Sequence, residues 1–106
     1  LGPQAVAGEA TQHIAARVAA AFAVQLVRQG KANQRLNNAE LEQHCRLEQH
    51  GERLLHGAML RLHWSARTYH RVLRVARSIA DLAGSAAITP PHLAEAIQYR
   101  RVLQEI

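Results

Sequence analysis

At 106 residues, 48% of them apolar, the chain can form one domain with a modest core, which excludes a second domain and a deep catalytic cleft. The 13 Lys and Arg against 8 Asp and Glu give a net charge of +5, and every cation except Lys31 is arginine. Arginine favours two-pronged contacts with phosphate or carboxylate, which leaves nucleic acid, a nucleotide or an acidic surface as candidate partners, and the single cysteine, Cys45, excludes an internal disulfide.

Features of the whole sequence predict whether the chain is a fragment and where in the cell it is located. Met59 is the only methionine, so the chain does not begin with an initiator, and we expect a fragment of a longer protein. We see no basic-then-apolar leader, and the most apolar stretch, residues 14–27, is shorter than the roughly 20 residues that cross a bilayer. We therefore expect a cytoplasmic location and no membrane partner.

Helix is favoured along almost the whole chain, because alanine is abundant and β-branched residues never alternate with polar ones over a strand length. Residues 1–8 are predicted to be a flexible lead-in, and residues 9–106 an all-α domain. A first helix is predicted over residues 9–29, ended by Gly30. Its buried side is predicted from apolar residues at four-residue spacing: Ile14, Val18, Phe22 and Leu26.

The second helix has a start signal. Asn37 can cap it, with Glu40 reaching back as a capping box. It is predicted to run to about residue 49, where Gly51 breaks the pattern. A short third helix follows, lined by Leu54, Leu55, Ala58, Met59 and Leu62.

The fourth helix is predicted to begin after the cap Ser65, with Trp64 and Tyr69 spaced as a hydrophobic staple, and to end at Gly84. Its apolar side is expected to contain Tyr69, Val72, Leu73, Ala76, Ile79, Ala80 and Ala83.

The fifth helix is predicted to begin at Pro90, capped by Thr89, with Ile88 packing on Leu93. Leu93, Ala96 and Ile97 would face inward. The pattern predicts a small helical bundle with a long N-terminal helix and four further helices.

Motifs of catalysis are missing from the sequence. We find no glycine loop for phosphate, no paired acids and no nucleophile beside a base, so the chain is not expected to be an enzyme by itself. His44, Cys45 and His50 suggest a metal site, but adjacent residues project about 100° apart on a helix. We therefore predict no metal site and place Cys45 in the core, four residues after Leu41.

Arginine is concentrated in one part of the sequence. No acidic residue lies between Glu52 and Asp81, whereas six arginines do: Arg53, Arg61, Arg67, Arg71, Arg74 and Arg77. Arg67, Arg71 and Arg74 follow the i, i+4, i+7 rule and share one helix face. A solvated polar face would show the same spacing.

Arg67 is predicted at the second position of its helix, where the positive end of the helix dipole disfavours a cation by up to about 1 kcal/mol. Local stability therefore does not explain it. An arginine beside a hydroxyl cap at a helix start is well suited to meet an anion.

The fourth and fifth helices carry a family resemblance. Residues 65–84, SARTYHRVLRVARSIADLAG, resemble the signature near the end of magnesium-chelatase-like AAA+ ATPases of the ComM/YifB type, and residues 92–101, HLAEAIQYRR, are similar to that family's closing helix. Weaker matches upstream extend the resemblance to about residues 8–101: Gln29, Gly30, Asn33, Leu36, Cys45, Leu54 and Leu55.

This resemblance implies a C-terminal helical lid that folds over ATP bound to a preceding P-loop core and packs between the subunits of a hexameric ring. Arg67 would be the second sensor and reach the γ-phosphate of ATP in a neighbouring subunit. ATP and Mg²⁺ would be bound by the full-length protein and not by this domain alone. Arg71, Arg74 and Arg77 would be candidates for a subunit interface or a DNA contact.

The resemblance further implies a motor that acts on DNA in branch migration during natural transformation, and not insertion of magnesium into a porphyrin. One residue departs from the family pattern, because Phe22 stands where related sequences carry an arginine.

Two other classes of function fit the sequence. A freestanding basic helical module could bind nucleic acid through Arg67, Arg71, Arg74 and Arg77, although no stacking aromatics interleave with them. An interaction domain could present the same arginines to an acidic partner. The long motif favours the lid.

Overall fold

The computed structural model describes residues 3–105, with the side chains of residues 10–101. Its elements, in chain order, are α1 (Pro3–Gln29), the 3₁₀ turn η1 (Asn33–Arg35), α2 (Asn38–His44), α3 (Gln49–Arg61), α4 (Ala66–Leu82) and α5 (Pro90–Glu105). Over residues 3–105 no strand occurs. The predicted all-α fold, with a long first helix and four further helices, is confirmed.

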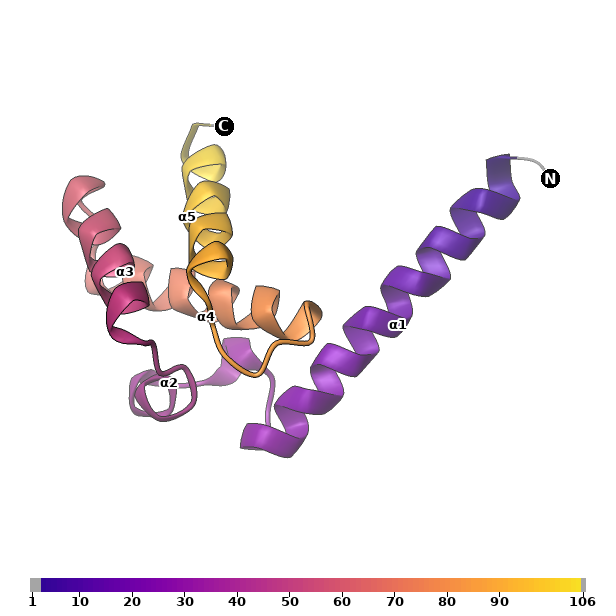
Figure 1. Ribbon diagram of the computed structural model, residues 1–106, viewed down its shortest axis with the longest axis horizontal. Helices are drawn as coiled ribbons and strands as arrows, with labels where there is room; N and C mark the ends of the chain where they lie inside the picture. The colour runs from indigo at the N-terminus through magenta and orange to yellow at the C-terminus, as the bar shows by residue number, and fades with distance from the viewer. Residues whose placement is uncertain (1–2, 106) are drawn as a thin grey trace.

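Helix α4 lies at the centre of the arrangement (Figure 1). Helix α5 packs on α4 and α3, and α2 packs on α4 from another side. Helix α1 approaches α4 only with its C-terminal part and then extends away from the other helices. The domain therefore consists of a body, α2–α5, and a projecting arm, α1.

The hydrophobic core belongs almost entirely to the body. Leu41, Leu55 and Leu93 are completely buried, one each from α2, α3 and α5. The core cluster as a whole contains Leu36, Leu41, Cys45, Leu55, Ala58, Trp64, Val72, Leu73, Ala76, Ala80, Ile88, Leu93, Ala96 and Ile97. The inward positions predicted for α5 are confirmed, and so is the core position of Cys45.

The predicted buried side of the first helix is wrong. Its four apolar residues are between 44% and 58% exposed, namely Ile14, Val18, Phe22 and Leu26. Ala21 and Gln25 are buried on α1 instead. The reason is that α1 packs against α4 only with its C-terminal part. The regular apolar spacing of α1 therefore does not indicate that these residues are buried within the domain.

The start of α1 also differs from the prediction. The helix begins at Pro3, so residues 3–8 of the predicted lead-in are helical, and residues 1 and 2 lie outside the described residues. Proline is favoured in the first turn of a helix, and a single glycine at position 8 costs only about 1 kcal/mol. The predicted end at Gly30, which has φ +77°, is confirmed.

The predicted caps of α2 and α4 are present. Asn37 accepts a hydrogen bond from the Glu40 N–H (2.9 Å), and the Glu40 carboxylate accepts one from the Asn37 N–H (2.9 Å). This backbone hydrogen bond, with the ion pair to Lys31, lowers the pKa of Glu40. At α4, Ser65 Oγ accepts from the Thr68 N–H (3.1 Å).

The C-terminus of α4 ends in a Schellman motif. Gly84 adopts φ +72°, its N–H donates to the Asp81 carbonyl, and the Ser85 N–H donates to the Ala80 carbonyl. Helix α5 begins at Pro90 as predicted. The Thr89 N–H donates to His92 Nδ1 (3.0 Å), so the histidine takes the place of the glutamate in a capping box.

The prediction that the second helix runs to about residue 49 and breaks at Gly51 is wrong. Helix α2 ends at His44, and Gly51 lies inside the first turn of α3. Gly51 is buried, and a Cβ atom there would lie 2.9 Å from Leu93 Cδ1 on α5. The absence of a side chain at Gly51 therefore allows α3 and α5 to approach closely.

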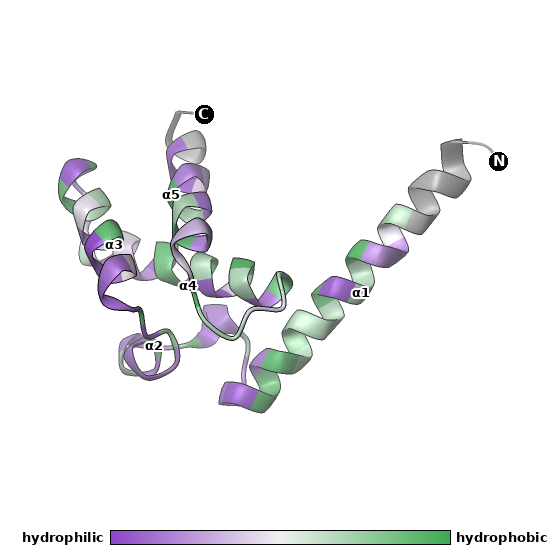
Figure 2. Cartoon of the chain, viewed as in Figure 1, coloured by the Kyte–Doolittle hydropathy of each residue, from purple (hydrophilic) through white to green (hydrophobic). Residues whose placement is uncertain are grey.

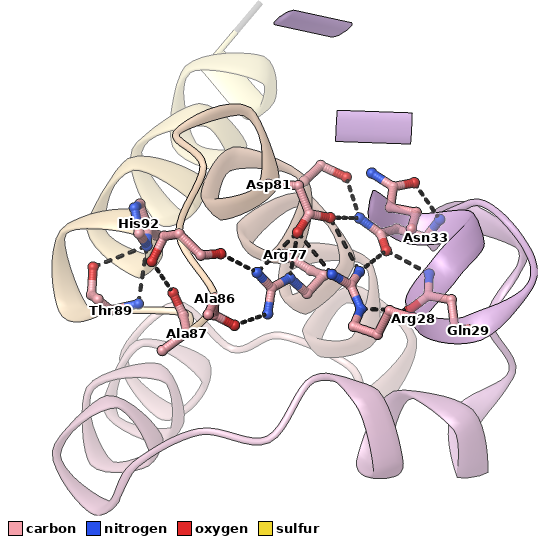
Figure 3. A network of polar contacts seen from close by, with 12 residues as sticks. Arg28, Gln29, Asn33, Arg77, Asp81, Ala86, Ala87, Thr89 and His92 are labelled. Atoms are coloured by element: carbon pink, nitrogen blue, oxygen red, sulfur yellow. Dashed lines mark hydrogen bonds and ion pairs between the residues drawn. The ribbon is translucent and has the colours of Figure 1, made fainter. Parts of the chain in front are cut away.

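A buried polar network joins α1 to α4 (Figure 3). The Asp81 carboxylate, which is inaccessible to solvent, accepts hydrogen bonds from Arg28 Nη1 (2.9 Å) and Nη2 (3.1 Å), and from Arg77 Nε (3.1 Å). We call Arg28, Asn33, Arg77 and Asp81 the Asp81 clamp. One carboxylate thus holds a guanidinium from each of the two helices.

Asn33 completes the Asp81 clamp. Its Nδ2 donates to Asp81 Oδ2 (2.9 Å) and Ser78 Oγ (3.1 Å), and its N–H donates to Gln25 Oε1 (3.0 Å). Its Oδ1 accepts from Arg28 Nη2 (2.9 Å) and Gln29 Nε2 (2.7 Å). All the polar atoms of this buried amide side chain are paired, as a stable buried network requires.

Gly51→Ala and Gly57→Ala form a matched pair within α3. Gly57 has open space around it, so alanine there should stabilise the domain by about 0.5–1 kcal/mol through helix propensity. Alanine at position 51 must displace buried Leu93 and should destabilise by about 1–3 kcal/mol. Urea unfolding followed by circular dichroism measures both. Equal shifts in one direction would contradict the role assigned to Gly51.

Asp81→Asn tests the Asp81 clamp through pH. Burial raises the pKa of Asp81, but hydrogen bonds from Arg28 and Asn33 and the charge of Arg77 lower it to below its ordinary value of 3.8. The clamp therefore contributes stability above that pH and loses it as pH falls through the folded-state pKa. At neutral pH the variant should lose about 3–5 kcal/mol.

Unfolding measured at acid pH gives a second test of the Asp81 clamp. Between pH about 5 and about 2, the free energy of unfolding of the variant should fall less steeply than that of the unmodified protein. Exposed Glu95 supplies the control, because Glu95→Gln should follow the unmodified protein throughout. Parallel pH profiles for Asp81→Asn and the unmodified protein would refute the clamp.

Candidate functional site

Arg67 lies at the second position of α4, as predicted. Its side chain is exposed, and within residues 10–101 it makes no hydrogen bond or ion pair. The Ser65 cap holds the helix start in place. A guanidinium at the positive end of a helix dipole, without a counterion, is stabilised by the arrival of an anion.

Arg67 lines an open pocket between α4 and the start of α2. The pocket has a volume of about 380 Å³ and is lined by Asn38, Ala66, Arg67, His70, Arg71 and Arg74. We call it the basic pocket. No carboxylate lines it, so none of the three guanidinium charges is neutralised there. The residues fit a phosphate-sized anion, and they offer no oxygen cluster of the kind that Mg²⁺ requires.

Arg71 and Arg74 differ in their freedom although both line the basic pocket. Arg71 is exposed and, like Arg67, has no polar partner in the part of the chain with described side chains. Arg74 is half-buried and donates from Nε (3.2 Å) and Nη2 (2.9 Å) to the Leu36 carbonyl. Arg74 therefore ties α4 to the link between η1 and α2, while its charge still faces the pocket.

Arg77 does not lie on the surface with the other candidate arginines. It is only 3% exposed, and besides Asp81 it donates to the Ser85 carbonyl (2.8 Å) and the Ala86 carbonyl (3.1 Å). Figure 3 shows its guanidinium between Asp81 and Ala86. Arg77 holds the loop after α4 and is not available to DNA or another subunit. At three residues beyond Arg74 it has rotated towards the core.

Two polar residues that line the basic pocket were not predicted from the sequence. His70 lies three residues after Arg67 and four before Arg74, so the same helical spacing rule would have included it. Asn38 comes from α2, and no local pattern places it near α4. Arg28 of the Asp81 clamp was also missed, because its partner lies 53 residues away.

Other candidate chemistry is confined to buried or dispersed groups. Burial raises the pKa of the Cys45 thiol, which keeps it protonated and unreactive at neutral pH. Among the side chains of residues 10–101, no three from His, Cys, Asp or Glu gather closely enough to hold a metal ion. No helix over residues 3–105 has the length and apolarity needed to span a bilayer.

Comparison with known proteins gives consistent matches. Residues 8–100 match the family described as magnesium chelatase, subunit ChlI C-terminal. The chain is 41% identical to competence protein ComM of Haemophilus influenzae, over 93% of this chain and 20% of that protein. It is 40% identical to the uncharacterized protein YifB of Escherichia coli, over 96% of this chain and 20% of that protein.

A further relative, the uncharacterized protein YifB of Salmonella typhimurium, is 37% identical over 96% of this chain and 20% of its own length. The chain therefore spans about a fifth of the length of the curated relatives it matches. No solved structure matches the chain significantly.

Arg77→Met and Arg71→Met separate the structural arginine from the free one. Removing Arg77 leaves the Ser85 and Ala86 carbonyls without their donor and removes one of the two guanidiniums that bind Asp81. The domain should therefore lose at least about 2 kcal/mol of stability. Removing exposed Arg71 should change stability by less than about 0.5 kcal/mol. Denaturant unfolding measures both, and a costly Arg71 variant with a neutral Arg77 variant would reverse our assignment.

Proposed function

The chain belongs to the magnesium chelatase subunit ChlI C-terminal family, and on this premise we propose that it is the helical lid of a ring-forming AAA+ ATPase in which Arg67 contacts the γ-phosphate of ATP held by a neighbouring subunit. The observation that carries the proposal is the unpaired Arg67 guanidinium at a helix start in a pocket without carboxylates. Within residues 10–101, Arg67 has no partner that would explain its position.

The geometry of the α4 start suits phosphate recognition. The Thr68 and Tyr69 N–H groups are bonded to Ser65, which leaves the Ala66 and Arg67 N–H groups at the helix start without an acceptor in the described part of the chain. These N–H groups and the planar guanidinium can converge on the same oxyanion. The Ser65 cap fixes their common orientation.

The proposed role of Arg67 is to sense and stabilise charge. The terminal phosphoryl group spreads negative charge over its oxygens as its bond to ADP lengthens, and a guanidinium in contact with these oxygens stabilises that state. Loss of the phosphate removes the anion and frees Arg67. The phosphate-binding loop and the Mg²⁺ ligands are assigned to the core outside this chain, because the basic pocket contains no carboxylate.

For the full-length protein we propose a hexameric motor that acts on DNA in branch migration during natural transformation. The support is the identity to a protein named for competence, together with the signature in residues 65–84. Arg71 is assigned to a contact with another subunit or with DNA, because it is exposed beside Arg67.

The alternative of a freestanding nucleic-acid module is weaker. This hypothesis assigns phosphate contacts to four arginines of one helix. Of these, Arg77 is buried and Arg74 is hydrogen-bonded to a carbonyl. Fewer phosphate contacts mean a weaker and less salt-dependent attraction. No observation on α4 compensates for this loss.

Arg67→Ala in the full-length ATPase tests the sensor. ATP turnover should fall by at least about 100-fold, since arginines that stabilise the transferred phosphoryl group contribute on the order of 10³ to 10⁵ in kcat. Thermal unfolding of the domain should stay within about 1 °C of the unmodified protein, because the removed cation is exposed and unpaired.

Two controls sharpen this test. Arg61→Ala removes an exposed arginine from α3, outside the basic pocket, and should leave turnover unchanged. Arg67→Lys keeps the charge but loses the two-pronged geometry, so turnover should recover only in part. Normal turnover by the Arg67→Ala ring would rule out the sensor role.

A further inference from the structure

The projecting part of α1 carries an apolar face that no described residue covers. Ile14, Val18 and Phe22 are 58%, 53% and 47% exposed. At four-residue intervals they stay within an arc of about 80° around the helix. We call these three residues the arm face. Figure 2 shows hydrophobic residues along much of α1, on a helix that stands apart from the body.

The arm face continues onto the body through two pockets that combine apolar residues with polar ones, of which Gln34 and Ser78 line both pockets. Val18 and Phe22 line an open pocket of about 290 Å³ together with Leu82 at the end of α4. Leu82 also lines the next pocket, of about 350 Å³, with Val75 of α4 and Tyr99 of α5. Val75, Leu82 and Tyr99 are themselves exposed, so exposed apolar side chains from α1, α4 and α5 surround these two pockets.

The charge pattern of α1 indicates the chemistry of the occupant. Among residues 10–27 the only Lys, Arg, Asp or Glu is Arg17, and its Nη2 already donates to the Leu82 carbonyl (3.2 Å). A surface with so few cations has little attraction for nucleic acid. A cluster of exposed apolar side chains of this kind instead marks a contact with another protein surface.

The relatives indicate which protein surface that is. The matched part is a fifth of their length, and the matching family is named for the C-terminal part of its subunit. Polypeptide that precedes such a domain joins it at the N-terminal end of α1, the end farthest from α4 in Figure 1. The arm is therefore the element nearest to the preceding polypeptide.

We propose that the arm face is the docking surface for the core that precedes this domain in the same polypeptide, with Phe22 at the centre of the contact. The core would present an apolar surface that fits between α1 and the α4–α5 side of the body. This inference rests on the proposed attachment to a core, but not on any role of Arg67. The two proposals can therefore fail separately.

Site-specific photocross-linking in the full-length protein tests the docking surface. A benzophenone amino acid is placed at position 22 in one variant and at position 27 in the other. Val27 is the matched control, because it is an apolar residue of the same helix, is 90% exposed and lies about 140° around the helix from Phe22. Equal mixtures of light and heavy isotope-labelled protein show by mass spectrometry whether each product joins one molecule or two.

We expect position 22 to cross-link to peptides that precede this domain within the same molecule, with a yield at least ten times that from position 27. Two results would overturn the proposal. Products that join light to heavy molecules would assign the arm face to a second subunit, and equal yields from the two positions would leave it without a dedicated partner. ATP turnover does not enter the readout, so failure here is distinct from failure of the Arg67 assignment.

Discussion

The arrangement of the domain depends on one buried carboxylate that serves two helices. Asp81 accepts from Arg28 at the end of α1 and from Arg77 on its own helix, while Asn33 fills the remaining acceptor position. The two guanidiniums would repel each other if the Asp81 carboxylate did not lie between them. Together with buried Ala21 and Gln25 and the hydrogen bond from Arg17 to the Leu82 carbonyl, this contact sets the direction in which α1 leaves the body.

The arginines of α4 illustrate how position on one helix separates structure from function. Arg67 and Arg71 lie in the N-terminal half, where no acid of the neighbouring α2 lines the basic pocket, and both are unpaired among the described side chains. Arg74 reaches a carbonyl, and Arg77 reaches a carboxylate and two carbonyls. Arginines near the start of α4 therefore have no polar partner, whereas those near its end are hydrogen-bonded, because the surroundings of the helix change from an open pocket to the interior.

Local chemistry explains which features the sequence could predict. The Asn37 capping box, the Ser65 cap and the end of α4 at Gly84 involve residues within five positions of one another, so they are legible in a linear pattern. The inward side of α5 and the place of Arg67 follow from these boundaries.

Tertiary contacts explain the errors. Gly51 looks like a helix breaker, yet it is required by Leu93 on a helix 42 positions away. The apolar spacing of α1 was correct as a pattern, but a periodic apolar face does not say whether its partner lies inside the domain. The i, i+4 rule places Asp81 beside Arg77, but the burial of Arg77 also depends on two carbonyls of a loop that no helical rule places there.

The position of the Asp81 clamp has a mechanical consequence. Asp81 and Arg67 lie near opposite ends of α4, a helix of 17 residues and therefore about 25 Å long. Because the C-terminal end of α4 is held against α1, a tilt of the body by about 5° at the clamp would displace the far end of α4 by about 2 Å. Such a displacement is comparable with the difference between a hydrogen-bonded guanidinium and one that has lost its contact.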